Sequence, residues 1–432
     1  MQQRLLAGAA AATITPPLGT SLAGLYRDRR ATSILSDLSA KALVLGNGSS
    51  DVAIVVVDLC YVPADLADRA RSRAESLTGI PAERVMLTCT HTHSGPVTVP
   101  SAWSEPDQSY LDVLVRRIGD AVCLAKQRQQ EARLLVGHGT EETIAFNRRY
   151  WMADGTVRTN PRYQSPDLVK PAGPIDPEVG VIRVEAATGA PIALLVNFPL
   201  HVAVLASTAI SADYPGVLSD FFRKLEGPDL VVLFATGCCG DVNHCDFSKP
   251  GPQGGQPFVE RIGTALAGEV TKVTTRLTPL TDASRIGFAQ KVVELPLRVP
   301  TADDIVWAEA RRDAEMQSMD AAGLAVVKAH RILRIRQHGW PTVTAMVQVM
   351  AVGDLAYVTL PGEIFVELGL GIKKRSPFPH TFVAELNGTA FGYIPTEKAY
   401  GEGGYEATSS LLMPGSGERL VETALELLEV VR

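Results

Sequence analysis

The sequence predicts an α/β fold in which a mixed β-sheet core is flanked by helices. Residues 52–57 and 85–89 are largely apolar runs on either side of 63–77, a stretch with helical spacing and charged residues on its outer face. This is the pattern of a βαβ unit, whose two strands are parallel and joined by a right-handed crossover. Residues 179–185 and 192–198 flank Ala-Thr-Gly-Ala-Pro and predict an antiparallel hairpin. Parallel and antiparallel pairs together predict a mixed sheet.

The other elements alternate along the chain in the same manner. Helical spacing predicts helices over residues 108–129, 214–225, 258–273, 301–331, 363–372 and 418–431, with Glu363 in the first turn of the fifth. Apolar runs predict strands over residues 133–136, 230–235, 292–299, 342–350, 355–360 and 381–386. We expect a single domain over residues 1–432, and the weakest boundary, near residue 285, would divide it into sub-domains 1–285 and 286–432.

Composition excludes several classes of function. The formal net charge of -6 and the pI near 5.8 provide no broad basic field, so nucleic acid is not an expected partner. No uninterrupted apolar run of about 18 residues predicts a membrane span. Six cysteines in 432 residues do not suggest a disulfide framework. The first residues lack the basic start of a secretory signal, so we expect a cytoplasmic protein, with homo-oligomerisation left open.

Polar residues that follow apolar runs are the candidate site. They are the Thr-His-Thr-His-Ser-Gly-Pro segment from Thr90, His201, Glu363, and the tyrosines Tyr393 and Tyr405. Strand ends of this kind line the ligand crevices of open α/β folds. Two imidazoles, a carboxylate and a phenol suit zinc, and three protein ligands beside one open position are typical of a catalytic site.

Six motifs in order resemble the neutral, non-lysosomal ceramidase family of zinc amidases, which cleave N-acyl bonds. They are Thr88-Cys-Thr-His-Thr-His-Ser-Gly-Pro96, Asn197-Phe-Pro-Leu-His201, Ile210-Ser-Ala-Asp213, Gly240-Asp-Val242, Pro361-Gly-Glu363, and Tyr393-Ile-Pro-Thr followed by Tyr405-Glu-Ala-Thr-Ser. The resemblance covers nearly the whole chain and implies a ceramidase-like catalytic domain. It also implies zinc ligation by His91, His201, Glu363 and Tyr393, whereas His93 and Tyr405 match residues that contact the substrate carbonyl and its oxyanion.

The chain departs from the family pattern in two places. Members that hydrolyse ceramide carry Gly-Asp-X-Ser, whereas Asn243 follows Gly240-Asp241-Val242 here. We therefore expect a substrate smaller or more polar than ceramide. The sequence also ends soon after the Tyr405 segment, so we expect a divergent bacterial-type homologue that lacks the carboxyl-terminal immunoglobulin-like domain of typical secreted members.

Four further residues are assigned roles around the expected zinc ion. The Asn243 amide is predicted to donate a hydrogen bond to a developing oxyanion or to a substrate oxygen. Asp213 is predicted either to orient a ligating imidazole or to act as base toward water. Arg148 is predicted either to bind a substrate carboxylate with two hydrogen bonds or to be a solvated loop cation, and Asp241 is predicted to contact substrate.

The sequence thus predicts a zinc-dependent hydrolase that cleaves a carbon-nitrogen amide bond of a small-molecule substrate through a metal-activated water. The alternatives are an ester or cyclic-amide hydrolase with the same centre, a ceramide hydrolase, and a pseudoenzyme that binds zinc or an acylated ligand. A competing metal or thiol site over Cys238, Cys239, His244 and Cys245 is less favoured than buried, inert cysteines.

Overall fold

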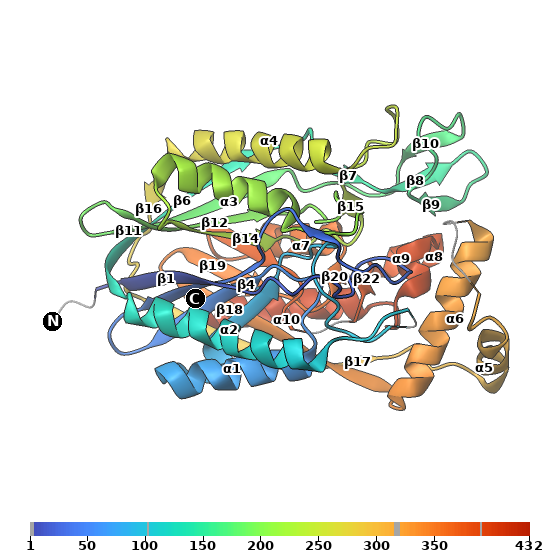
Figure 1. Cartoon of the computed structure of the whole chain (residues 1–432), viewed down its shortest axis with the longest axis horizontal. Helices are drawn as coiled ribbons and strands as arrows, with labels where there is room; N and C mark the ends of the chain where they lie inside the picture. The colour runs from blue at the N-terminus through green and yellow to red at the C-terminus, as the bar shows by residue number, and fades with distance from the viewer. Residues whose placement is uncertain (1–3, 102, 315–319, 389–390) are drawn as a thin grey trace.

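A nine-stranded mixed sheet forms the centre of the computed structural model, which describes residues 4–101, 103–314, 320–388 and 391–432 (Figure 1). The strand order is β14-β12-β11-β6-β1-β3-β4-β5, and β16 pairs with β6. The pairs β4–β5 and β12–β14 are parallel, and the other pairs are antiparallel. The strands are β1 (Leu6–Thr13), β3 (Ser39–Gly46), β4 (Asp51–Val57), β5 (Val85–Cys89), β6 (Gln130–Thr140), β11 (Glu178–Ala186), β12 (Pro191–Phe198), β14 (Val231–Thr236) and β16 (Thr278–Pro279).

A second sheet packs face to face against the first. It has the order β17-β18-β19-β21, in which β19 and β21 are parallel. Its strands are β17 (Ile286–Pro296), β18 (Thr342–Val352), β19 (Leu355–Thr359) and β21 (His380–Ala384). One apolar cluster joins the two sheets, with Leu43, Val56 and Leu195 on one side and Tyr357 and Phe382 on the other. Burial of this shared face excludes water from the middle of the molecule.

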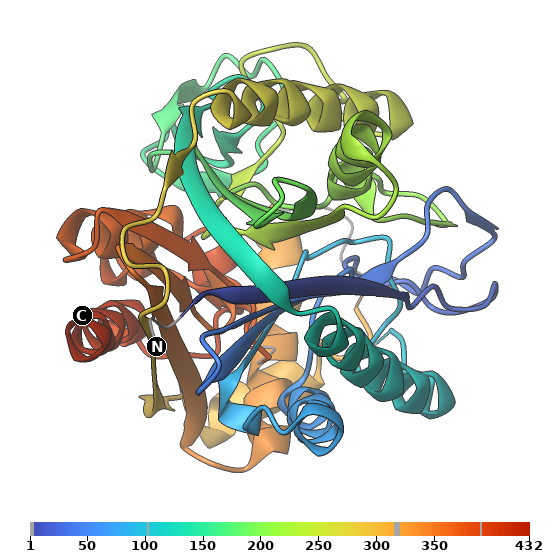
Figure 2. The same cartoon turned by 90° about the vertical axis from the view of Figure 1, so that its left-hand side faces the viewer.

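Helices cover the outer faces of both sheets (Figure 2). Those on the nine-stranded sheet are α1 (Ala64–Thr78), α2 (Gln108–Gln127), α3 (Asp213–Glu226) and α4 (Gln256–Thr274). Those on the second sheet are α7 (Val366–Arg375) and α10 (Ser416–Val431). The layers therefore run helix, sheet, sheet, helix. Among the described residues, no helix has both the length and the apolar character needed to cross a membrane.

Further elements connect these layers, and those labelled β8, β9, β10, α5, α6, α8 and α9 gather at one end of the molecule (Figure 1). They are β2 (Ser33–Ile34), the 3₁₀ turn Ala82–Arg84, β7 (Phe146–Asn147), β8 (Arg149–Met152), β9 (Val157–Thr159), β10 (Leu168–Pro171), β13 (Ala209–Ile210), β15 (Val242–Asn243), α5 (Ala302–Glu309), α6 (Ala321–His338), β20 (Glu363–Ile364), β22 (Tyr393–Ile394), α8 (Glu397–Glu402) and α9 (Tyr405–Ser409).

The structure confirms the mixed α/β class, the βαβ unit and the hairpin, and it corrects three element boundaries. The expected helix over 363–372 begins only at Val366, because Glu363 and Ile364 pair with β22 instead. The strand expected over 292–299 is Ile286–Pro296, whose whole length pairs with β18. The helix expected over 301–331 is two helices, α5 and α6, and its residues 315–319 lie outside the described residues. The division near residue 285 stays a prediction.

The carboxyl ends of the three parallel pairs, β4–β5, β12–β14 and β19–β21, point to the same end of the molecule. Thr236, at the end of β14, donates from Oγ1 to the carbonyl of Thr90, just beyond β5, over 2.8 Å. Glu385, just beyond β21, donates its backbone N–H to the carbonyl of Thr236 over 3.0 Å. These bonds hold the three ends together, so the residues that follow them meet at one place.

Candidate metal centre

Three loops bring the side chains of His91, His201 and Glu363 together. His91 follows β5, His201 follows β12, and Glu363 follows β19 through the Pro361-Gly362 turn. The two imidazole Nε2 atoms lie 3.0 Å apart, and Glu363 Oε2 lies 3.3 Å from His91 Nε2 and 3.6 Å from His201 Nε2. All three residues are buried. They form one of two groups of potential metal ligands among the described residues; the other is Cys60, His91 and His93.

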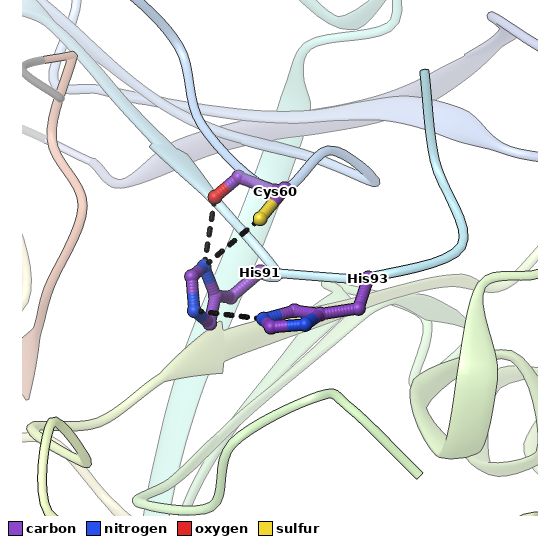
Figure 3. Close-up of side chains that lie close together, drawn as sticks. All are labelled: Cys60, His91 and His93. Carbon is purple, nitrogen blue, oxygen red and sulfur yellow. Dashed lines mark hydrogen bonds between the residues drawn. The ribbon is translucent and has the colours of Figure 1, made fainter. Parts of the chain in front are cut away.

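Backbone carbonyls fix the orientation of both imidazoles. His91 Nδ1 lies 2.8 Å from the carbonyl oxygen of Cys60 (Figure 3), and His201 Nδ1 lies 3.3 Å from that of Cys239. When Nδ1–H donates to a carbonyl, the neutral ring presents a lone pair at Nε2. The backbone of His91 has φ 70, which non-glycine residues rarely adopt and which is characteristic of constrained functional positions.

The donor set fits a zinc ion. The two imidazole Nε2 atoms face each other 3.0 Å apart, and Glu363 Oε2 is buried without a hydrogen-bond partner among the described residues. A cation bound by all three would satisfy these acceptors. Ligands at about 2.0–2.1 Å from a tetrahedral zinc lie roughly 3.4 Å from one another, close to the three separations found here.

The Glu363 carboxylate is held on its other side. Tyr61 donates its hydroxyl to Oε1, which leaves Oε2 directed toward the histidines. Burial raises the pKa of Glu363, but the nearby His91 imidazole and the Tyr61 hydroxyl lower it more, so the pKa lies below its usual value. Gly362 precedes it with φ 73, and a Cβ there would lie 2.8 Å from the carbonyl oxygen of Gly392. Only glycine fits this close approach to the strand that carries Tyr393.

His93 lies beside the three potential ligands, with its Nε2 3.3 Å from His91 Nε2 (Figure 3). Its carbonyl accepts a hydrogen bond from Arg29 over 2.6 Å. Burial, together with the charges of His91 and Arg29, lowers the pKa of His93 well below its usual value, so the ring is neutral near pH 7. Gly24 lies against this ring, because a Cβ at that position would be 2.3 Å from His93 Cγ.

Tyrosines line the next part of the centre. Glu363 and Tyr393 are direct partners in the parallel pairing of β20 with β22, and the rings of Tyr393 and Tyr405 lie 5.2 Å apart. Tyr405 Oη lies 2.5 Å from Tyr26 Oη. Burial and the neighbouring Tyr393 hydroxyl raise the pKa of Tyr405 well above its usual value. Tyr405 therefore keeps its proton at neutral pH and can donate it in a hydrogen bond.

Arg148 is buried next to this group. Its Nε donates to Glu406 Oε1 and its Nη2 to the carbonyl of Gly240, both over 2.7 Å, and its guanidinium carbon lies 5.2 Å from the centre of the Tyr393 ring. The sequence suggested either a solvated loop cation or a ligand for a substrate carboxylate. The structure corrects the first alternative, because the charge is paired inside the protein. A role in substrate binding stays a prediction.

Asp213, Asp241 and Asn243 bond to other groups. Asp213 accepts from the backbone amides of residues 204, 205 and 214, and so fixes the loop after His201. Asp241 accepts from the Val366 amide over 2.9 Å and from Asn147 over 2.8 Å. Asn243 donates to Asn160 over 3.0 Å and accepts from the Cys245 amide over 2.9 Å. Their catalytic and substrate-binding roles stay predictions.

The cysteine segment does not join the metal centre. Cys238, Cys239 and Cys245 are buried with free thiols, and burial raises their pKa values. A protonated, enclosed thiol is a poor nucleophile and a poor ligand. Neither group of potential metal ligands among the described residues includes Cys238, Cys239, His244 or Cys245.

Sequence reasoning missed five residues that the structure places at the centre: Gly24, Tyr26, Cys60, Tyr61 and Glu385. Glu385 is buried, and its Oε2 accepts from the amides of Ile364 (2.7 Å) and Cys239 (3.2 Å). Burial raises its pKa to about 8. Tyr61 and Glu385 each come shortly after an apolar run, so the pattern that identified His91 could also have identified them. Gly24 and Tyr26 lie in a loop that carries no comparable signal.

Comparison with solved structures identifies the architecture. Neither a protein-family model nor a curated protein matches the sequence. The structure of neutral ceramidase from Pseudomonas aeruginosa superposes with a TM-score of 0.78 at 18% identity, over 100% of this chain and 75% of that one. The chain has a neutral ceramidase-like fold. A ceramidase complexed with C2 aligns equally well, with a TM-score of 0.78 at 17% identity and the same coverage.

The neutral ceramidase-like fold confirms the resemblance inferred from the motifs. Identities of 17–18% establish the architecture alone. Activity must therefore be argued from the residues of the centre.

Proposed function

We propose that this protein is a zinc-dependent hydrolase that cleaves a carbon-nitrogen amide bond in a small-molecule substrate more polar than ceramide. The observation that carries this proposal is the buried convergence of His91 Nε2, His201 Nε2 and Glu363 Oε2 within 3.0–3.6 Å of one another. His91, His201 and Glu363 would hold the ion, with Tyr393 as the fourth ligand predicted from sequence.

A bound zinc ion would polarise the amide carbonyl and lower the pKa of a water molecule to about 7. The chain's own residues would orient the substrate. The neutral His93 ring and the protonated Tyr405 hydroxyl would hydrogen bond to the substrate carbonyl as negative charge develops on its oxygen, and their contacts with His91 and Tyr26 support these roles. Asn243 donates one amide hydrogen to Asn160, and it would donate the second to a substrate oxygen.

Metal analysis tests the centre. We expect about one zinc ion per chain by elemental mass spectrometry and its loss in the His91→Ala/His201→Ala double variant. The matched control is His138→Ala/His380→Ala, which removes another close pair, with His138 Nε2 2.9 Å from His380 Nδ1 and no part in the proposed centre. Absence of zinc from the wild type, or its retention in the first variant, would overturn the assignment.

A substrate panel tests the reaction. Zinc-depleted and zinc-restored protein would be assayed on matched amides, esters and cyclic amides and on a short-chain ceramide. Amide cleavage that returns with zinc supports the proposal. Preference for esters or cyclic amides, or cleavage of the ceramide, would replace the proposed reaction or substrate while keeping the centre. Zinc binding without turnover of any member would favour a pseudoenzyme.

A further inference from the structure

A cavity separate from the candidate centre lies between β7, the loop that follows β15, and the start of α4 (Figure 1). Its volume is about 410 Å³, which is within the range of cavities that hold small-molecule ligands. Among the described residues that line it, none belongs to the candidate centre. The cavity is formed in part by His244, which the proposed hydrolase chemistry leaves without a role.

His244 brings a buried hydrogen-bond acceptor to the cavity wall. The residue is 8% exposed, and its Nε2 lies 3.0 Å from the carbonyl oxygen of Gln253. A carbonyl oxygen can only accept, so Nε2 carries the proton. Burial lowers the pKa of the ring, which is therefore neutral near pH 7 and keeps a lone pair on Nδ1. This Nδ1 is buried without a hydrogen-bond partner among the described residues, and a ligand hydroxyl that reached it would satisfy it.

Two consecutive glycines lie beside the His244 ring. Gly254 and Gly255 have φ 159 and φ 81, conformations that residues with a side chain rarely adopt. Gly254 is close to the ring, because a Cβ at that position would lie 3.8 Å from His244 Nε2. A glycine backbone can shift with little steric cost, which gives a ligand hydroxyl a route to the ring.

Two cations at the cavity have no acidic partner. Lys249 and Arg261 both line it and are exposed, and neither forms an ion pair with another described residue. The Arg261 guanidinium carbon lies 5.7 Å from the centre of the Phe258 ring. One carboxylate, that of Asp246, also lines the cavity and accepts from the amide and hydroxyl of Ser248. With the imidazole neutral, the lining carries one net positive charge, which suits a monoanion such as a carboxylate.

Apolar side chains form much of the remaining lining, namely Ile144, Phe146, Phe258 and Ile262. An apolar wall with a few polar groups of different kinds is typical of sites that bind an organic molecule and fix its orientation. The cations select a negative group, and the imidazole acceptor selects a hydrogen-bond donor.

We propose that this cavity is a binding site for a small carboxylic acid that carries a hydroxyl group and an apolar body. Lys249 and Arg261 would pair with the carboxylate, His244 Nδ1 would accept from the hydroxyl, and the apolar side chains would contact the body. The site lies apart from the metal centre, so its ligand binding does not depend on the proposed hydrolase function.

Three matched probes test the site by calorimetry: phenyllactate, phenylpropionate, which lacks the hydroxyl, and the diol in which an alcohol replaces the carboxylate of phenyllactate. We expect one molecule of phenyllactate to bind per chain. Phenylpropionate should bind about 5-fold more weakly, because one hydrogen bond is lost. The diol should bind at least about 10-fold more weakly, because the charge-assisted bonds are lost. Absence of phenyllactate binding, or equal binding of all three probes, would overturn the proposal.

Variants of the lining place the probe in this cavity. Lys249→Ala and Arg261→Ala change exposed side chains and should each weaken phenyllactate binding by about 5-fold without affecting the diol. Arg117→Ala is the matched control and should bind as the wild type does, because Arg117 is an exposed arginine on α2 that pairs with Asp120 over 3.9 Å. His244→Phe should bind phenyllactate and phenylpropionate equally, since no acceptor remains for the hydroxyl. Wild-type affinity in both Lys249→Ala and Arg261→Ala would place the probe elsewhere and overturn the proposal.

Discussion

Glu363 lies directly opposite Tyr393 in the parallel pairing of β20 with β22, so a carboxylate and a phenol from distant parts of the sequence occupy neighbouring strands. The Glu363 amide donates to the carbonyl of Gly392 over 2.9 Å, and the Phe365 amide donates to that of Ile394 over 3.1 Å. This backbone pairing fixes the position of the carboxylate before any ion binds. It also explains why the segment is a strand at Glu363 and becomes helical only at Val366.

Glu363→Gln should lower zinc affinity by more than about 100-fold, because it replaces a carboxylate with a neutral amide at an oxygen, Oε2, that has no hydrogen-bond partner among the described residues. Tyr393→Phe should lower zinc affinity by about 10-fold if the phenol is the fourth ligand. Chelator competition measures both, with Tyr400→Phe as control because the Tyr400 hydroxyl bonds to Ser410 instead. Wild-type affinity in Tyr393→Phe would remove Tyr393 from the ligand set.

Tyr26→Phe should lower kcat about 10-fold without changing zinc content. The Tyr26 hydroxyl contacts the Tyr405 hydroxyl at 2.5 Å and so orients the donor expected at the substrate carbonyl. Steady-state kinetics and metal analysis of the same preparation measure the two effects separately. Tyr163→Phe is a suitable control, because its hydroxyl accepts from the Gln253 amide. Unchanged kcat in Tyr26→Phe would show that Tyr405 is held by other contacts.

The sequence could predict the parts of the centre that depend on local pattern. His91 and His201 follow apolar runs, and such runs become buried strands wherever they pair. The prediction of a helix over 363–372 was wrong at its start. A glutamate before an apolar stretch is a favourable helix start, whereas the pairing of Glu363 with β22 depends on residues far along the chain. Local preference could not reveal that competition.

Contacts between distant loops could not be predicted at all. Tyr26 reaches Tyr405, and Gly24 packs on His93, only because the two sheets bring their strand ends together. Arg148 lies in a segment that has the composition of a surface loop. Its side chain is buried because it pairs with Glu406 on the short helix α9. Neither segment has a residue pattern that indicates its contact with the other. These residues were found from the folded chain.

Glu385 should make the zinc-free protein less stable as pH rises. Its pKa of about 8 in the folded state lies above the usual value of about 4.3, so the folded state binds the proton more tightly than the unfolded state does. Its contribution to stability is therefore complete below about pH 4 and is lost as pH rises to about 8. Between pH 6 and 8.5 the expected loss in the free energy of unfolding is roughly 2.5 kcal/mol.

Glu385→Gln should remove this part of the pH dependence, because the amide does not ionise and its oxygen can still accept from the Ile364 amide. Urea unfolding at pH 6 and 8.5, in the presence of a chelator, compares the variant with the wild type. Glu422→Gln, at an exposed ion pair with Arg375, is the control. Parallel stability changes in wild type and Glu385→Gln would contradict the raised pKa.

Arg148→Ala should destabilise the fold by about 3–5 kcal/mol, because it leaves the buried Glu406 carboxylate without its closest cation. Arg375→Ala is the control: its pair with Glu422 is exposed, and its loss should cost less than about 1 kcal/mol. The free energies of unfolding of Arg148→Ala, Glu406→Ala and the double variant, measured in urea, complete a double-mutant cycle. The double variant should lose less stability than the sum of the single variants, since no uncompensated charge then remains; additive losses would contradict direct coupling of the two residues.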